Sequence, residues 1–297
     1  MTSVATGAGP SYQTSQIKRH RSTKAEVNRR RAGLFEIVKA MKPMTVRQVF
    51  YQATIVGLVD KTEAGYAKVQ TDLVAMRKSG DLPYSWLADN TRWQRKPQTF
   101  DSVEQALLDT ARFYRKSLWS EADSYVEIWL EKDALSGVVL PVTDIFDVPL
   151  MVARGYASLS FLHSAADYIA SLDVPTFIYH LGDYDPSGVN AAETIETTLR
   201  QMAPAADIQF RRLAVWPSQI MQWNLPTRPT KTTDTRSRNF GEISVELDAI
   251  PPDRLRQLVE EAITQHLPPD QFRVLKAAEE SERELISALV GNMGGGR

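Results

Sequence analysis

The chain has 297 residues, 43% of them hydrophobic and 24% charged, which is enough to bury more than one hydrophobic core. It contains no cysteine, which excludes disulfides, thiol catalysis and cysteine-ligated zinc sites. Its formal net charge is −1, whereas a simple nucleic-acid-binding domain is usually strongly basic.

The amino-terminal residues predict a disordered tail, over residues 1–22, that ends in positive charge. Residues 1–16 are small and polar and lack both hydrophobic periodicity and the apolar stretch of a secretory signal. No apolar run in the sequence approaches the roughly 20 residues of a membrane span. We therefore expect a cytoplasmic protein without a membrane partner.

A cluster of cations follows the polar tail. Between residues 16 and 32, seven lysines and arginines stand against one acid, Glu26. Such a cluster can neutralise DNA phosphates, although a solvated start of a helix explains it as well. The candidate DNA-binding residues in this segment are Lys18, Arg19, Arg21, Arg29, Arg30 and Arg31.

Three helices are predicted over the next part of the chain. The first covers residues 23–41 and ends before Pro43. The second begins after Thr45, a suitable N-cap, and the third covers residues 63–79 and stops at Gly80.

Three helices followed by a small hairpin are the outline of a winged-helix domain, which we place at residues 23–118. Short extended segments over residues 81–93 would form the hairpin. A plain helical bundle explains the same pattern, and this alternative stays open. In a winged helix one helix enters a groove of DNA, and the candidate phosphate contacts on the third helix are Lys68, Arg77 and Lys78.

The pattern changes after residue 118, where short apolar segments begin to alternate with helical ones. Such alternation predicts a parallel sheet with both faces covered, so the fold class is α/β. We assign residues 119–297 to this Rossmann-like domain and a carboxyl-terminal extension. The expected strands are residues 124–130, 148–154, 176–182 and 207–215.

Acidic residues follow two of these strands. Glu131 ends the first, in WLEKDAL, and Asp183 and Asp185 end the third, in HLGDYDPSG. If the two strands are neighbours, three carboxylates converge on the edge of the sheet where ligands bind. Oxygen ligands favour Mg²⁺, which would offset the repulsion between the acids and present a phosphodiester to attack. Glu131 is also a candidate general acid or base, and an aspartate pair that only caps a strand and a helix is the alternative.

Two glycines flank the aspartates. Gly182 and Gly188 permit a close approach of the backbone, and a helix that begins near Pro186 offers its N-terminus to an anion.

Three segments carry a resemblance to a known family. LEKDAL, VARGYASLS and LGDYDPSG resemble the Toprim domain of topoisomerases, primases and some nucleases. More narrowly, they are similar to the A subunit of topoisomerase VI and its meiotic double-strand-break relatives, which share a glutamate at an EK-A strand end and a D-x-D-P-x-G motif. The resemblance implies that Glu131, Asp183 and Asp185 hold Mg²⁺.

The same family places a winged-helix domain before the Toprim domain, with a catalytic tyrosine in an Arg-x-x-[Phe/Tyr]-Tyr motif. The segment TVRQVFYQ matches this motif at Arg47, Phe50 and Tyr51. The resemblance then covers about residues 25–250 and implies that Tyr51 is the nucleophile.

Helix geometry independently places Tyr51 away from the core side of its helix. At about 100° per residue, Tyr51 lies roughly opposite the apolar stripe, and Arg47 shares its side. An arginine beside a phenol can hold a phosphate and favour the phenolate. A half-buried tyrosine at a domain contact is the alternative. The stripe consists of Val46, Val49, Phe50 and Ala53.

The resemblance implies Mg²⁺-dependent cleavage of double-stranded DNA by transesterification, with Tyr51, Arg47 and Glu131 as catalytic residues. It also implies a homodimer, because in the family the tyrosine of one protomer works with the metal site of the other. Strand passage would need a separate ATPase subunit, since this sequence has no glycine-rich ATP-binding motif. Two alternatives stay open: a Toprim nuclease that uses metal-bound water, and a DNA-binding module without catalysis.

Two further segments receive no firm role. Residues 227–238 form a polar, basic loop. The segment VELDAI, with Glu246 and Asp248, either adds a metal ligand or alternates toward solvent.

Overall fold

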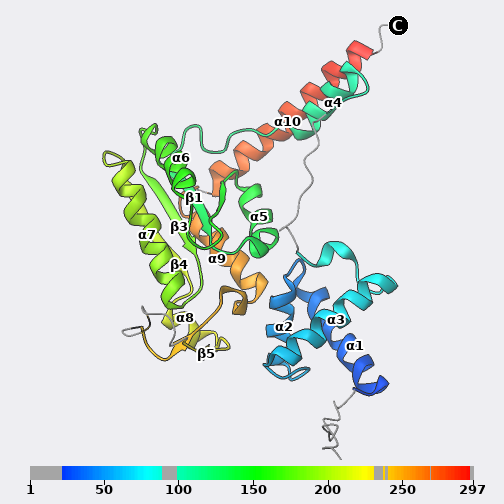
Figure 1. The fold of residues 1–297 in the computed structure, drawn as a ribbon. Helices are drawn as coiled ribbons and strands as arrows, with labels where there is room; N and C mark the ends of the chain where they lie inside the picture. Colours follow the sequence, from blue (N-terminus) through cyan, green and yellow to red (C-terminus); the bar gives the residue numbers. More distant parts are fainter. Residues whose placement is uncertain (1–21, 89–98, 231–236, 238–239, 268, 295–297) are drawn as a thin grey trace, which may run out of the picture.

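The computed structural model describes residues 22–88, 99–230, 237, 240–267 and 269–294. These residues form a helical unit at the amino-terminal end, a sheet covered by helices, and a two-helix arm (Figure 1). The predicted disorder of residues 1–21, and with it Lys18, Arg19 and Arg21, lies outside the described residues.

The described helical unit contains α1 (Lys24–Met41), α2 (Val46–Ile55) and α3 (Glu63–Ser79). Each helix begins at a threonine N-cap, and Thr23 and Thr45 form capping boxes with the residue three positions later. α3 ends at Gly80, whose φ of 84° lies in the left-handed region that favours glycine. These bounds confirm the three predicted helices.

The hairpin expected of a winged helix is only partly covered by the described residues. A short 3-10 turn, Tyr84–Trp86, follows α3, and Leu87 pairs with Met44 through an isolated parallel bridge. Residues 89–98, where the hairpin would continue, lie outside the described residues. The winged helix therefore stays a prediction.

A parallel sheet forms the centre of the second unit, and four strands belong to it in the described part of the chain. They lie in the order β2-β1-β3-β4, and each neighbouring pair is parallel. Their ends fall within two residues of the predicted ones, which confirms the α/β class, and the parallel sheet is compatible with a Rossmann-like domain. The strands are β1 (Tyr125–Leu130), β2 (Leu150–Val152), β3 (Thr176–Leu181) and β4 (Ile208–Ala214).

Helices cover both faces of this sheet (Figure 1). α6 and α7 pack on one face around Trp129 and Ile178, and α5 and α9 pack on the other around Ile128 and Leu130. Successive residues of β1 thus enter opposite cores, as the period of a strand requires. The helices are α5 (Ser136–Ile145), α6 (Leu159–Ala170), α7 (Pro186–Met202) and α9 (Pro252–Thr264).

The segment between β4 and α9 joins the sheet to the helical unit. Its Leu247–Ala249 turn contacts α2, and Ile250 accepts a hydrogen bond from the side chain of Gln48. Arg256, at the start of α9, donates to the carbonyl of Pro43 at 3.1 Å. The elements of this segment are α8 (Pro217–Gln222), β5 (Arg228–Pro229), β6 (Ile243–Ser244) and the 3-10 turn η4 (Leu247–Ala249).

Two helices, α4 (Val103–Phe113) and α10 (Pro269–Gly294), run side by side and project from the sheet unit as an arm (Figure 1). The predicted boundary at residue 118 assigns α4 to the helical domain, whereas α4 packs along α10. Buried Glu279 secures α10, because it accepts from the backbone of Lys116 at 3.0 Å and pairs with Arg283 at 2.9 Å.

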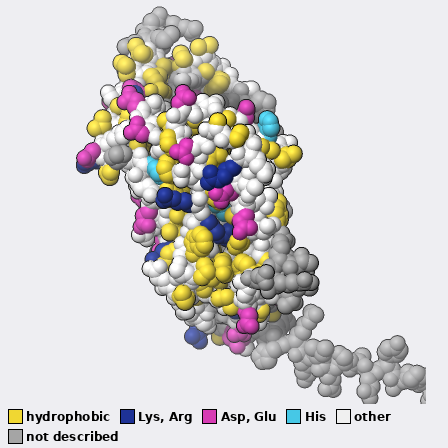
Figure 2. All heavy atoms as spheres, turned by 90° about the vertical axis from the view of Figure 1, so that its left-hand side faces the viewer, with side chains coloured by type: hydrophobic (Ala, Val, Ile, Leu, Met, Phe, Trp, Pro, Cys, Tyr) yellow, Lys and Arg dark blue, Asp and Glu magenta, His cyan; other side chains and the backbone are white. Residues whose placement is uncertain are grey.

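The surface on the side of α7 carries acidic and basic side chains interspersed with hydrophobic ones (Figure 2). Among the described residues, the lysines and arginines of this side are thus interspersed with acids and do not form one continuous basic patch. Within the described residues, no helix combines the length and apolar character that crossing a membrane requires.

Candidate functional site

Glu131 and Asp183 meet because their strands are neighbours in the sheet. β1 pairs with β3 in a register that sets Leu130 opposite Leu181, and the amide of Glu131 donates to the carbonyl of Leu181 at 3.0 Å. The amide of Asp183 in turn donates to Oε2 of Glu131 at 2.9 Å. The expected adjacency of the two strands is confirmed.

Gly182 and Gly188 leave the room that the Glu131 carboxylate occupies. A Cβ at Gly182 would lie 2.6 Å from Oε2 of Glu131. A Cβ at Gly188 would lie 3.1 Å from the same oxygen and 2.5 Å from the carbonyl oxygen of Asp183. A side chain at Gly188 would therefore force the backbone of Asp183 or the carboxylate of Glu131 to shift.

Arg212 holds the loop that carries these residues. From β4, its guanidinium donates to the carbonyls of Gly182 at 3.0 Å and Gly188 at 3.1 Å, and also to that of Asp183. We call the carboxyl ends of β1 and β3, with Glu131, Asp183 and Asp185, the acid edge. Its backbone is thus held in place by hydrogen bonds from the neighbouring strand β4.

Asp185 caps α7 and pairs with a cation. Its Oδ1 accepts from the amide of Gly188 at 2.8 Å, and its Oδ2 lies 3.0 Å from Arg228 of β5. The capping role that the sequence left open is therefore observed for Asp185. The same carboxylate still lies at the carboxyl end of β3, as predicted.

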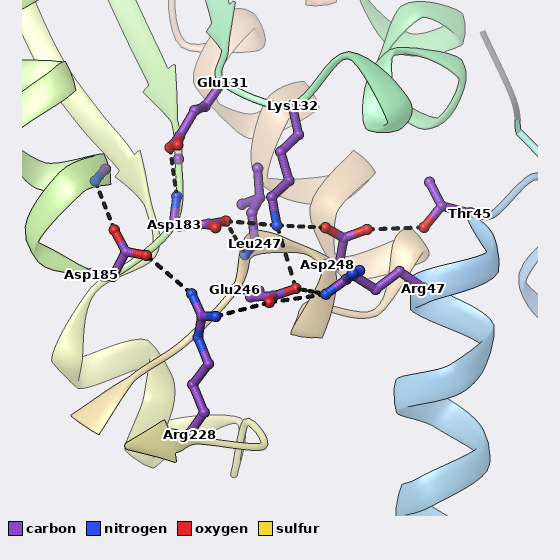
Figure 3. A network of polar contacts seen from close by, with 12 residues as sticks. Thr45, Arg47, Glu131, Lys132, Asp183, Asp185, Arg228, Glu246, Leu247 and Asp248 are labelled. Carbon is purple, nitrogen blue, oxygen red and sulfur yellow. Dashed lines mark hydrogen bonds and ion pairs between the residues drawn. The ribbon is translucent and has the colours of Figure 1, made fainter. Parts of the chain in front are cut away.

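Lys132 is the cation on which the neighbouring acids converge (Figure 3). Its ammonium group lies 3.1 Å from Asp183, 3.5 Å from Glu246 and 2.9 Å from Asp248. Although burial lowers the pKa of Lys132, these three carboxylates raise it well above its usual value. A protein cation thus lies among acids whose like charges would otherwise repel.

Glu246 and Asp248 connect this cluster to the helical unit. Arg47 of α2 donates to both oxygens of Glu246, at 3.0 and 2.7 Å, and Thr45 donates to Asp248 at 3.0 Å (Figure 3). The exposed fractions of Glu246 and Asp248 are 7% and 2%, so the solvent-facing interpretation of VELDAI is wrong. Against the effect of burial, Lys132 and Arg47 lower the pKa of Glu246.

Glu131 differs from the other acids because no ion pair to it is found among the described residues. Burial, followed by the charge of Asp183, raises the pKa of Glu131 to about 7. A carboxyl group in this state can take up or release a proton near neutral pH.

The donor atoms at this edge suit Mg²⁺, but the present orientation of the two aspartates does not. The donors are hard carboxylate oxygens, which suit the ion. Asp183 and Asp185, however, are turned toward Lys132 and Arg228, and no group of three or more potential metal ligands is assembled within the described residues. Glu131, Asp183 and Asp185 could hold the ion only after the aspartates change partners.

Tyr51 is buried rather than accessible. Its exposed fraction is 4%, and it packs with the hydrophobic core of the sheet unit. The apolar stripe of α2 faces the helical core, and α2 also contacts the Leu247–Ala249 turn of the sheet unit. Tyr51 therefore lies at a contact between the two units, as in the alternative from the sequence, but it is buried rather than half-buried.

The guanidinium of Arg47 is engaged with Glu246, and although its charge lowers the pKa of Tyr51, this effect is smaller than that of burial. Burial, with Glu246 acting in the same direction, raises the pKa of Tyr51 to about 12. The prediction that Arg47 favours the phenolate of Tyr51 is therefore wrong for this arrangement: the phenol of Tyr51 is buried and protonated.

The candidate DNA-binding cations have different environments. Arg30 and Arg31 pair with Asp72 at 2.6 and 3.0 Å. Because Arg30 is also buried, it forms a structural ion pair and does not present its charge to DNA, contrary to the prediction. Arg77 lies over the ring of Tyr84 at 4.6 Å. Among the members of the set that the structure describes, Arg29, Lys68 and Lys78 are exposed.

Sequence reasoning missed the roles of Lys132 and Arg228. Lys132 directly follows Glu131, so its position in the EK pair was the available signal. Arg228 belongs to the basic loop over residues 227–238, but nothing in its local pattern identifies Asp185 and Glu246 as its partners. Most of that loop lies outside the described residues.

Comparison with known proteins adds no family assignment: neither a family model nor a curated protein matches this chain.

Proposed function

We propose that this chain is a Toprim-type enzyme that cleaves DNA with the help of Mg²⁺ at the edge formed by Glu131, Asp183 and Asp185. The observation that carries the proposal is the adjacency of β1 and β3, which brings a carboxylate of one strand within 2.9 Å of the backbone that carries the other two. Ligands of parallel sheets bind at this end of the strands.

The side chains of this edge have separable tasks. Lys132 and Arg228 orient Asp183 and Asp185 and offset their charges. Glu131, without an ion pair in the described part of the chain, would serve either as a ligand of the ion or as the general acid or base that exchanges a proton with a water molecule or a leaving oxygen. Bound Mg²⁺ would supply stabilisation of the negative charge that develops on the phosphodiester.

DNA as the substrate is supported by the resemblance of the motifs and by the helices that precede the sheet. Lys68 and Lys78 are exposed on α3, where they can reach phosphates of a duplex. We extend the proposal to a winged-helix arrangement of α1 to α3 that binds the duplex.

Hydrolysis fits the geometry better than transesterification by Tyr51. The phenol is 4% exposed and its pKa is raised to about 12, so it is neither accessible nor ionised. Tyr51 could attack only after α2 leaves the Leu247–Ala249 turn and, as in the similar family, meets the acids of a second copy in a homodimer. Strand passage with a separate ATPase subunit would be possible only with transesterification by Tyr51, and not with hydrolysis.

Cleavage of supercoiled plasmid tests the proposal. We expect wild-type protein with Mg²⁺ to produce nicked and linear DNA with protein-free ends, and chelation to stop it. Glu131→Gln should slow cleavage by at least about 100-fold, because the variant keeps the shape of the side chain but not its charge or proton. Tyr51→Phe should cleave at the wild-type rate.

Two matched variants control for unrelated effects. Glu280→Gln changes an exposed glutamate on the arm, and Tyr168→Phe changes a half-exposed tyrosine on α6. Both should behave as wild type. Full activity of Glu131→Gln would refute the proposal, whereas protein-linked DNA ends that vanish in Tyr51→Phe would replace hydrolysis with transesterification.

A further inference from the structure

A cavity of about 520 Å³ lies between the helical unit and the acid edge. Its wall includes Arg47 of α2, Tyr66 and Arg77 of α3, and Lys132 and Asp183 of the sheet unit. Cavities of roughly 300–1,000 Å³ are the usual size for small-molecule sites. The cavity thus opens directly beside the proposed cleavage site.

Arg77 is the lining cation without an anionic partner. Arg47 and Lys132 are engaged with Glu246, Asp248 and Asp183 at 3.5 Å or less. The side chain of Arg77 makes no hydrogen bond or ion pair with any described residue, although its guanidinium lies over the ring of Tyr84 at 4.6 Å. Its Nε is buried without a partner, whereas its terminal nitrogens have no partner among the described residues and are not buried, so they are the donors that an anion in the cavity could reach.

The surrounding wall suits a phosphate. Tyr66, Gln70 and Arg77 recur at intervals of four and seven residues, so they lie on one face of α3, toward the cavity. The planar guanidinium of Arg77 can bond two oxygens of a phosphate at once. The cavity acids already have cations beside them, which reduces their repulsion of an incoming anion.

We propose that this cavity binds the phosphate and sugar of a single unpaired nucleotide of the DNA strand, with Arg77 as the phosphate contact. This inference rests on the proposed function, because it makes the bound nucleotide a neighbour of the phosphodiester that is cut. A cavity of this size admits one nucleotide but not a duplex. The exposed Lys68 and Lys78 of α3 remain available for the paired part of the substrate.

Binding measured without metal separates this inference from cleavage. The probes are a labelled blunt duplex and the same duplex with a four-nucleotide single-stranded tail, titrated with wild-type protein in a chelating buffer. Arg77→Met should weaken binding of the tailed duplex about tenfold and leave the blunt duplex unchanged, because one charge-assisted contact is lost. The dependence of the tailed complex on salt should fall by about one phosphate contact.

Matched variants exclude general effects of charge and folding. Arg200→Met removes an exposed arginine that pairs with Glu196 on α7 and should change neither probe. Arg77→Lys keeps the charge without the two-pronged geometry and should fall between wild type and Arg77→Met. Thermal unfolding of each variant verifies that it folds.

Three outcomes of the binding experiment would overturn the inference. Equal weakening of both duplexes would mean a general surface contact, and unchanged binding by Arg77→Met would mean that the cavity holds only water; either overturns the inference. Arg77-dependent binding of deoxythymidine monophosphate without any preference for the tail would assign the cavity to a free nucleotide, and would overturn the DNA assignment. Because cleavage is not measured, an inactive protein with Arg77-dependent tail binding would count against the proposed function alone.

Discussion

Gly188 shows how closely single residues are fitted at the acid edge. It occupies the first turn of α7, where its amide donates to Asp185, and the position of its absent Cβ lies between Glu131 and the backbone of Asp183. The glycine is therefore required by close approach and not by an unusual backbone angle.

We predict that Gly188→Ala destabilises the protein by about 1–3 kcal/mol, since the added methyl meets a backbone oxygen at 2.5 Å and something must shift. Cleavage should fall as well, because Glu131 is displaced. Chemical denaturation followed by circular dichroism measures the first effect.

Gly291→Ala is the matched control for this substitution. Gly291 also lies in a helix, α10, but a Cβ there would meet nothing within 4 Å. Alanine should be neutral or stabilise the helix by up to about 1 kcal/mol. Similar losses for both variants would contradict the steric account of Gly188.

The individual site residues were predictable to different degrees. Glu131, Asp183 and Asp185 could be located because strand ends carry a local signal in apolar runs and acids. The burial of Tyr51 could not be predicted, because it depends on a turn about 200 residues later in the chain. Lys132 was visible in the sequence, but its three acidic partners come together only through the fold.

At the scale of elements, the amino-terminal end of α2 is fastened more firmly than that of α1. Thr23 and Thr45 form equivalent capping boxes, with Glu26 and Gln48 respectively. The hydroxyl of Thr45 additionally donates to buried Asp248. The same type of cap thus also serves as a contact between the two units.

This difference predicts unequal costs for the same substitution. Thr23→Val should cost about 1 kcal/mol of the free energy of unfolding, which is the usual value of an N-cap. Thr45→Val should cost about 1–2 kcal/mol more, because an acceptor on Asp248 loses its donor in a buried place. Urea denaturation of the two variants gives the comparison, and equal midpoints would show that the Asp248 contact contributes nothing.

Elements were the most predictable level of this structure. Thr23, Thr45 and Gly80 mark helix ends through hydrogen bonds and backbone angles that depend on neighbouring residues only. The strands were found from short apolar runs for the same reason. The order β2-β1-β3-β4 depends on how the strands pack and could not be predicted from the sequence. The sequence predicted the acid site only for the case in which β1 and β3 are neighbours.

At the scale of the whole molecule, Lys132 joins parts that are distant in the sequence. Its ammonium group, at the end of β1, bonds Asp183 of the neighbouring strand end and Asp248, which also holds α2. Removing such a cation leaves buried carboxylates without compensation, and this is usually more harmful than replacing the whole ion pair.

We therefore predict that Lys132→Met destabilises the protein by about 3–5 kcal/mol. The double variant Lys132→Met with Asp248→Asn should recover part of this loss, because one of the stranded charges is removed. Thermal unfolding of the two single variants and the double variant completes the cycle. Additive losses would show that the two side chains do not interact energetically.

The contacts of α2 also have a consequence for biosynthesis. The bonds from Thr45 to Asp248 and from Arg47 to Glu246 span 203 and 199 residues. At roughly 5–20 residues per second, the ribosome needs on the order of 10–40 s to make the intervening chain. During that interval the sheet unit that buries Tyr51 is not yet complete, so the apolar ring of Tyr51 stays exposed on the nascent chain. We expect chaperones to bind this surface until the finished protein buries it.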